Sequence, residues 1–143
     1  MASVKVLLVD DEKDFTAALS ERLELRDIEV FVADNGQDAL ALAAQHRFDA
    51  VILDLQMPGM DGIETLKKLL SGDPDQQVVL LTGHGTISKS IEAIKAGATD
   101  FLEKPVDIQV LTEKIDEAAV KRMVLLEKRY AETVDNILKT RGW

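Results

Sequence analysis

Residues 50–62 read Ala-Val-Ile-Leu-Asp-Leu-Gln-Met-Pro-Gly-Met-Asp-Gly, and this stretch guides the interpretation of the whole chain. It begins with a short apolar run, which has the length of a buried strand and ends at Asp54. The loop that follows contains Pro58, Gly59 and Gly62, residue types that interrupt regular structure. The stretch therefore predicts a buried strand with an aspartate at its carboxyl end.

The same arrangement, an apolar strand followed by a helix, recurs along the chain. Strands are predicted over residues 4–9, 28–33, 50–53, 78–81 and 99–103. Helical spacing of apolar residues predicts helices near 14–26, 39–44, 63–70 and 87–98, and from Asp107 onward, where the aspartate suits an N-cap. Strands that are apolar on both faces imply a parallel sheet covered on both sides. The predicted fold class is α/β: a flavodoxin-like, doubly wound sheet of five parallel strands, ordered 2-1-3-4-5, with five helices.

Composition restricts the classes of function. The 143 residues suit one domain, and no apolar run approaches the ~18 residues of a membrane span. The absence of cysteine excludes disulfides, thiolate zinc sites and thiol nucleophiles. A net charge of −9 gives an acidic body, which nucleic acid and anionic membranes repel. We therefore expect a cytoplasmic protein that itself binds neither nucleic acid nor membranes.

Polar side chains follow four of the predicted strands, at the point where each strand ends. They are Asp10 and Asp11, Asp54, Thr82 and Lys104. With the predicted strand order these ends are neighbours, at the edge where doubly wound sheets bind ligands. One aspartate at a strand end is most often a turn or cap residue, but capping does not explain all five residues at one edge. The sequence predicts a single site containing three carboxylates, a hydroxyl and an ammonium.

The residue types in this site indicate its chemistry. Three clustered carboxylates repel one another and need a cation, and oxygen ligands without His or Cys favour Mg²⁺. The Lys104 ammonium and the Thr82 hydroxyl complete a pocket for a phosphoryl group bonded to an aspartate. Asp54 is the predicted nucleophile, because Asp10 and Asp11 share one turn and resemble a metal-binding pair.

Four separate segments of the chain form one pattern: Leu8-Val9-Asp10-Asp11-Glu12, Leu53-Asp54-Leu55-Gln56-Met57-Pro58-Gly59-Met60-Asp61-Gly62, Leu81-Thr82-Gly83 and Phe101-Leu102-Glu103-Lys104-Pro105. This pattern resembles the receiver domains of bacterial two-component response regulators. The match runs from about residue 4 to 120, and Thr82-Gly83-His84-Gly85 is most similar to receivers of enhancer-binding regulators. The resemblance implies phosphorelay signalling, in which a sensor histidine kinase or phosphotransfer protein phosphorylates Asp54. It implies a switch that assists only its own phosphorylation and dephosphorylation, and no other enzyme activity.

The resemblance also implies how the metal is held. Asp11 and Asp54 would supply carboxylate oxygens to Mg²⁺, and Gln56 would supply its backbone carbonyl. Asp10 would act through a bound water. This ligand set agrees with the oxygen donors expected from the residue types alone. The implied cofactor is therefore Mg²⁺.

Further implied roles concern the phosphoryl group and the switch. Lys104 would pair with the phosphoryl group, and Gly83 would leave that group unobstructed. Thr82 would move toward the phosphoryl group while Phe101 turns inward, which would change a surface read by a partner. The resemblance also implies a cis peptide bond between Lys104 and Pro105.

Other functions share parts of this pattern. Phosphatases of the haloacid-dehalogenase type use a strand-end aspartate, Mg²⁺ and a lysine, but need a second aspartate where this chain has Gln56. A nucleotide-binding G-x-G-x-x-G loop is only half present at Gly83-His84-Gly85. An unphosphorylated receiver-like adaptor would be favoured if Asp54, Thr82 or Lys104 were missing, and all three are present.

The last helix is predicted to continue past the receiver, as one helix over residues 107–139. Apolar residues at steps of three or four form a stripe: Ile108, Leu111, Ile115, Ala119, Met123, Leu126, Tyr130, Val134 and Ile137. We place the receiver in residues 1–120 and a helical extension, a linker or coiled-coil segment, in 121–143. An exposed stripe of this kind needs cover, which a second copy or the chain's own domain can supply; we favour a homodimer. The charged residues beside the stripe are predicted to be edge positions of the coiled coil: Lys121, Arg122, Glu127, Lys128, Arg129 and Glu132.

Overall fold

Strands and helices alternate along the chain in the computed structural model, which describes residues 3–56, 61–83 and 87–140. The elements are β1 (Lys5–Val9), α1 (Lys13–Glu24), β2 (Glu29–Ala33), α2 (Gly36–Gln45), β3 (Ala50–Asp54), α3 (Gly62–Gly72), β4 (Val78–Thr82), α4 (Ile87–Lys95), β5 (Asp100–Glu103) and α5 (Ile108–Thr140). The described strands form a parallel sheet in the order β2-β1-β3-β4-β5, so the predicted fold class is confirmed. Pro58, Gly59 and His84 lie outside the described residues.

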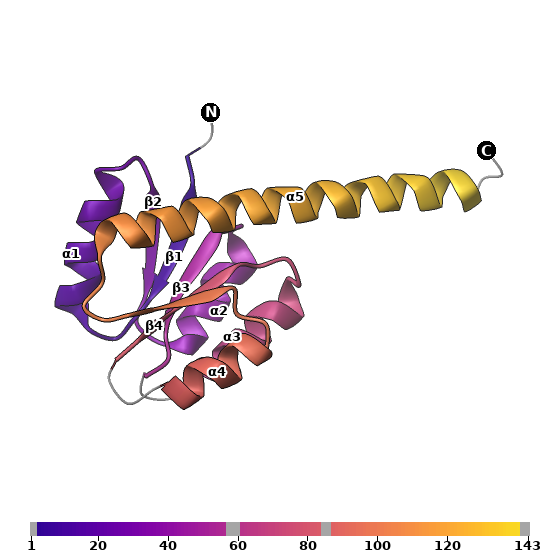
Figure 1. Cartoon of the computed structure of the whole chain (residues 1–143). Coiled ribbons are helices and arrows are strands. Elements are labelled where there is room, and N and C mark those ends of the chain that lie inside the picture. Colours follow the sequence, from indigo (N-terminus) through magenta and orange to yellow (C-terminus); the bar gives the residue numbers. More distant parts are fainter. Residues whose placement is uncertain (1–2, 57–60, 84–86, 141–143) are drawn as a thin grey trace.

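The sheet separates two hydrophobic cores (Figure 1). Helices α1 and α5 cover one face, while α2, α3 and α4 cover the other. Alternate residues of β1 show the division: Val6 and Leu8 belong to the first core, and Leu7 and Val9 to the second. Every residue of β3 and β4 is buried, because both faces of these central strands are covered. The continuous apolar runs in the sequence follow from this burial.

Two helices end shortly before a residue with a left-handed backbone conformation. Asp27 has a φ of 62°, and α1 stops three residues before it, at Glu24, instead of reaching residue 26 as predicted. Helix α4 ends at Lys95, before Gly97 with its φ of 117°. Helix α5 begins as predicted beside Asp107, whose Oδ1 accepts from the N–H of Gln109 at 2.9 Å.

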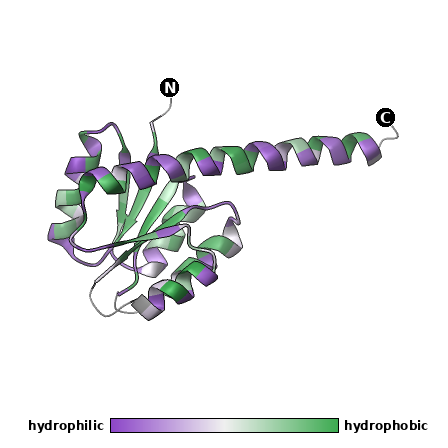
Figure 2. Ribbon diagram, in the orientation of Figure 1, coloured by the Kyte–Doolittle hydropathy of each residue, from purple (hydrophilic) through white to green (hydrophobic). Residues whose placement is uncertain are grey.

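Helix α5 is a single helix of 33 residues that continues past the domain (Figure 1). Its first turns cover the sheet, where Leu111, Ile115 and Ala118 are buried. Apolar residues continue along the extension among hydrophilic ones (Figure 2). Within the described part of the chain, no helix combines the length and the apolar character that a membrane span requires.

Candidate functional site

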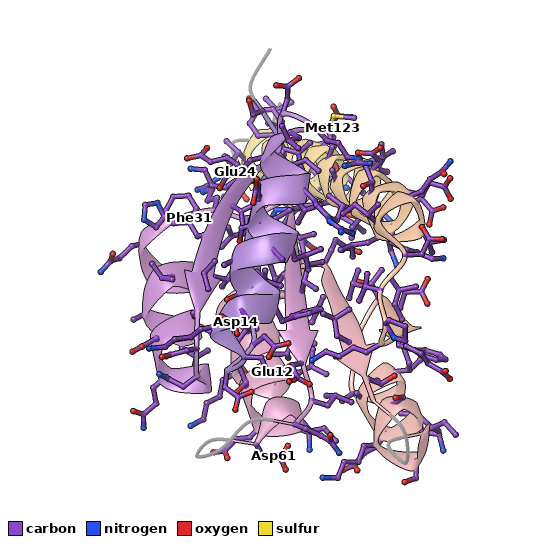
Figure 3. The ribbon with its side chains drawn as sticks, turned by 90° about the vertical axis from the view of Figure 1, so that its left-hand side faces the viewer. Glu12, Asp14, Glu24, Phe31, Asp61 and Met123 are labelled. Atoms are coloured by element: carbon purple, nitrogen blue, oxygen red, sulfur yellow. The ribbon has the colours of Figure 1, made fainter. Side chains whose placement is uncertain are left out.

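The carboxyl ends of four neighbouring strands bring the predicted site residues together. Asp10 follows β1, Asp54 ends β3 and Thr82 ends β4, and the parallel register places these ends side by side. Lys104 follows β5, where its backbone N–H donates to the Thr82 carbonyl at 2.7 Å. In Figure 3 the labelled Glu12 and Asp61 lie at this end of the molecule, toward which the strand arrows point. The predicted edge of the sheet is therefore the observed one.

Helix α3 packs closely against the end of the strand that carries Asp54. A Cβ atom on Gly62 would lie 2.7 Å from the Leu55 Cα and 2.9 Å from the Leu55 carbonyl oxygen, so no side chain fits there. The Asp61 carboxylate caps the helix by accepting from the N–H of Ile63 at 2.8 Å. Gly62 thus has a packing role that the sequence pattern indicated only as a loop residue.

Three carboxylates form one cluster at this edge. Asp10, Asp11 and Asp54 each offer an oxygen, and these oxygens lie within 4.8 Å of one another. Asp10 and Asp54 are only 1% and 4% exposed, while Asp11 is exposed. In each buried aspartate, Oδ1 accepts from the backbone N–H two residues later, from Glu12 at 3.0 Å and from Gln56 at 3.1 Å. The backbone therefore fixes the direction of both carboxylates.

Lys104 is the cation of the site. Its Nζ lies 2.8 Å from Asp10 Oδ2, 3.6 Å from Asp54 Oδ2 and 3.4 Å from Glu12 Oε1. Partial burial opposes its charge, but the Asp10 hydrogen bond and the surrounding carboxylates outweigh it and raise the pKa of Lys104. The peptide bond that joins it to Pro105 is cis, the form that the resemblance implied. Lys104 thus reaches Asp10 and Asp54 at once.

Two further residues that the sequence did not indicate contact Lys104. One is Glu12, and the other is Phe15, whose ring centroid lies 4.5 Å from Nζ. Glu12 follows the aspartate pair directly, which is a weak signal for a role in the site. Phe15 has helical spacing with the core residues of α1, so the sequence predicted for it only a place in the hydrophobic core.

Burial is the main cause that raises the pKa of Asp54, to about 6, and the Asp10 and Asp11 carboxylates add to it. The N–H of Gln56 and the Lys104 ammonium act in the opposite direction. A single ammonium does not balance three carboxylates, so the cluster requires further positive charge. Its donors are all carboxylate oxygens, which fit a hard divalent cation, and Asp10, Asp11 and Asp54 are the residues that could hold it.

Thr82 and Phe101 lie on the neighbouring strands β4 and β5. The Thr82 hydroxyl donates to the Leu102 carbonyl at 3.4 Å, so it is directed toward β5. Phe101 pairs in register with Leu80 and is 43% exposed. A Cβ atom on Gly83 would meet the Gln56 Oε1 at 3.9 Å, an ordinary contact distance. A Cβ atom would therefore fit at Gly83 without a clash.

An apolar cleft of about 540 Å³ adjoins the site, between α1 and the segment that leads into α5. Lys104 forms part of its wall, so the cleft opens directly beside the carboxylate cluster. The lining residues are Phe15, Ala18, Leu19, Arg22, Gly83, Lys104, Pro105 and Val106.

Solved structures with the same fold include a receiver domain protein and NtrX. A response regulator receiver domain protein from Clostridium thermocellum superposes with a TM-score of 0.82 and 32% identity, covering 85% of this chain and 98% of that one. NtrX from Brucella abortus, solved with ADP, superposes with a TM-score of 0.83 and 29% identity, covering 90% of this chain and 30% of that one.

Sequence relatives are larger regulators. The C4-dicarboxylate transport transcriptional regulatory protein DctD of Rhizobium meliloti is 38% identical over 128 residues, which are 90% of this chain and 28% of DctD. The regulatory protein AtoC of Escherichia coli is 34% identical, over 88% of this chain and 27% of AtoC. The chain thus spans little more than a quarter of these relatives. The sequence model of the response regulator receiver domain matches residues 6–116, and this chain therefore belongs to that family.

Proposed function

We propose that this receiver domain accepts a phosphoryl group on Asp54 from a histidine kinase or a phosphotransfer protein, in a Mg²⁺-dependent reaction. The observation that carries the proposal is the placement of Asp54, which is buried at the centre of the carboxylate cluster and within 3.6 Å of Lys104. In the proposed step a carboxylate oxygen attacks the phosphorus of a phosphohistidine. The P–N bond breaks, the imidazole leaves and takes up a proton, and an aspartyl phosphate forms.

The chain's own residues prepare this reaction. The N–H of Gln56 holds one oxygen of Asp54 and so fixes the direction of the carboxylate. Lys104 offers its ammonium to the oxygens of the incoming phosphoryl group, and Thr82 offers its hydroxyl. Bound Mg²⁺ would supply positive charge for Asp54 and for the phosphoryl oxygens, with Asp11, Asp54 and the Gln56 carbonyl as its direct protein ligands and Asp10 acting through a bound water.

The domain acts, in this proposal, as a switch in phosphorelay signalling within the cytoplasm. The Thr82 hydroxyl leaves the Leu102 carbonyl for the phosphoryl group, and the Phe101 ring moves into the space that becomes available. The long 3.4 Å hydrogen bond and the exposed ring support this, because neither group is firmly held. The two states would differ at the α4–β5–α5 face, where a partner can bind one in preference.

The phosphatase alternative lacks a residue for its chemistry. It needs a general acid/base two residues after the nucleophile, and Gln56, an exposed amide, can neither donate nor accept that proton. The adaptor alternative has no observation in its favour, because the three carboxylates and the lysine lie together at one site.

The experiment for the acceptor is intact-mass spectrometry after incubation with acetyl phosphate and Mg²⁺. The wild-type chain should gain one phosphoryl group, while Asp54→Asn should gain none. Asp116→Asn is the matched control, because it neutralises an exposed aspartate on α5 and should be labelled like the wild type. Equal labelling of Asp54→Asn and wild type would exclude Asp54 as the sole acceptor.

A homodimer through the extension of α5 is a second proposal, with the receiver in residues 1–120 and the pairing segment in 121–143. Its support is a stripe of exposed apolar residues: Val120, Met123, Val124, Leu126, Tyr130, Val134, Ile137 and Leu138. Met123, Tyr130 and Ile137 follow one another at steps of seven residues. Val120 and Val134 are fourteen residues apart, and Glu127 occupies the heptad position between them. Such heptad spacing is typical of helices that pair with a second helix.

A further inference from the structure

Beyond Ala118, two arginines of helix α5 form ion pairs with the domain. Arg122 Nη2 donates to Asp73 Oδ2 at 2.8 Å. Arg129 binds Asp75 in bidentate fashion, through Nε at 2.7 Å and Nη2 at 2.8 Å. The arginines are seven residues apart, two turns along one face of the helix. Both arginines therefore bind the same loop, residues 73–77, which lies between α3 and β4.

This loop is itself firmly built. Asp73 Oδ1 accepts from the N–H of Asp75 at 3.1 Å, which closes a tight turn. The Gln77 side chain donates to the Asp75 carbonyl at 3.0 Å, and the Gln76 side chain donates to the Phe48 carbonyl at 3.1 Å. Asp75, Gln76 and Gln77 are all buried. The two aspartates are thus presented to α5 from a fixed backbone.

Each of the two ion pairs has one buried partner. Arg122 is 5% exposed, and its Nη1 has no hydrogen-bond partner among the described residues. The Asp75 side chain is 6% exposed, although the side chain of its partner, Arg129, is 58% exposed. The hydrogen bond from Arg129 is the main cause that lowers the pKa of Asp75, so its carboxylate remains charged. Removal of one partner would leave a buried charge unpaired.

We propose that Asp73 and Asp75 form a clasp that holds α5 through Arg122 and Arg129, so that the helix beyond Ala118 leaves the domain as a preordered extension. An isolated helical segment of this length is marginal in water, and the clasp supplies the tertiary contacts that it otherwise lacks. Met123 and Tyr130 each follow an arginine by one residue, about 100° around the helix. The clasped helix therefore directs its apolar stripe away from the domain, and Met123 lies on the outer side of the helix (Figure 3). Its exposed fraction is 53%.

The clasp deepens the proposed homodimer, and this part of the inference rests on it. A helix that is already ordered loses less conformational entropy when it pairs, so the clasp should strengthen association. We expect a second copy of this chain to cover the stripe, because heptad spacing is typical of a helix that pairs with an identical helix. The clasp loop leads into the amino end of β4, whereas the Asp54 site lies at the carboxyl ends of the strands. Clasp variants should therefore still accept phosphate from acetyl phosphate, which checks that the domain is folded.

Amide hydrogen exchange tests the clasp in the full chain. Asp73→Asn with Asp75→Asn keeps the side-chain shapes and removes both charges. Amides of residues 119–130 should then exchange at least about tenfold faster than in the wild type. The control, Asp135→Asn, removes the exposed pair with Lys139 at 3.0 Å and should alter only the last turn of α5. Unchanged exchange over residues 119–130 in the double variant would overturn the clasp.

Two further variants separate the ion pair from general damage. Arg129→Gln alters an exposed arginine and keeps Arg122 and both aspartates. Labelling by acetyl phosphate checks that this variant is folded, so its partial loss of protection should be measurable even if the double variant does not fold. Exchanging the charges, with Asp75→Arg and Arg129→Asp together, should restore much of the protection that either single change removes. A purely structural role of the loop predicts no such rescue and would contradict the proposal.

Sedimentation then measures dimerisation. If the wild type associates, the clasp variant should have a dimer dissociation constant at least about tenfold higher, and the charge exchange should lower it again. Equal association of the wild type and the variant would refute the link between clasp and dimer. A wild type that stays monomeric at high micromolar concentration would refute the homodimer, while hydrogen exchange still decides the clasp.

Discussion

At the scale of single residues, the charge on Asp54 opposes folding in the absence of metal. Its pKa is raised to about 6 from 3.8, so the folded chain binds this proton more tightly than the unfolded chain does. The protonated Asp54 side chain therefore contributes its full stabilisation of the folded state below about pH 4. This stabilisation is lost as the pH rises through about 6.

Asp54→Asn should consequently stabilise the metal-free protein at high pH. We expect the free energy of unfolding to rise by about 1–2 kcal/mol at about pH 8, after allowance for solvent screening at the open side of the site. The gain should largely disappear near pH 4.5, where the folded wild type is protonated as well. Urea unfolding in EDTA at both pH values measures this, and a gain that does not depend on pH would contradict it.

The metal site gives a second residue-scale prediction. Asp11→Ala removes an exposed oxygen donor and should weaken Mg²⁺ binding at least about tenfold. Lys104→Ala should not weaken it, because that change removes a cation 2.8 Å from Asp10 and leaves the carboxylates less balanced. Calorimetric titration measures both affinities.

The control for that titration is Asp14→Ala, which removes an exposed carboxylate on α1 outside the cluster (Figure 3). It should bind Mg²⁺ like the wild type. Normal binding by Asp11→Ala would show that the metal lies elsewhere.

Which site residues could be predicted depended on backbone position. Asp10, Asp54, Thr82 and Lys104 come at strand ends, and parallel strands in the predicted order place these ends together. The contacts of Glu12 and Phe15 with Lys104 depend on the directions of the side chains, which the spacing of residues in the sequence does not predict. The residue types and their places were thus predictable, while the finer environment of the ammonium was not.

At the scale of elements, the strands and their order were predictable because each apolar run is buried on both faces. The far half of α5 was predicted less well. Arg122 and Arg129 were expected at the edges of a coiled coil, and instead they bind Asp73 and Asp75 of the chain's own domain. Helical spacing identifies an apolar face, but it does not identify a partner 49 residues away in the chain.

Gly97, which follows α4, gives the prediction for this scale. Its φ of 117° is unfavourable for other residues, and a Cβ atom there would lie 2.8 Å from Leu70 Cδ1 on α3. Gly97→Ala should therefore lower the free energy of unfolding by about 1–3 kcal/mol in urea.

Gly72, the last residue of α3, is the matched control, because a Cβ atom there meets nothing within 4 Å. Gly72→Ala should be neutral or should stabilise by up to about 1 kcal/mol. Equal effects of the two substitutions would show that the backbone at Gly97 is not strained by a side chain.

At the scale of the whole molecule, the domain and the extension of α5 have opposite characters. The domain buries its apolar residues in two cores, one on each face of the sheet. The extension exposes them, with Tyr130 74% and Ile137 49% accessible. Clusters of exposed apolar side chains on a helix mark a surface that another element covers. The sequence predicted this stripe. Only the structure shows which side of α5 contacts the domain.

The last prediction concerns what covers the stripe. Tyr130→Lys with Val134→Lys places two charges on it and should raise the dissociation constant of the proposed dimer at least about 100-fold, since each buried apolar side chain contributes roughly 1.5–3 kcal/mol. Asn136→Lys, an exposed change on the same helix but off the stripe, should leave the constant within about threefold. These variants keep Arg122 and Arg129, whereas a chain ending at residue 120 would also lose the clasp. Sedimentation velocity with and without acetyl phosphate measures all three proteins. If the lysine variant and the wild type sediment alike as dimers, the contact lies elsewhere on the domain, and the stripe is covered by something other than a second copy.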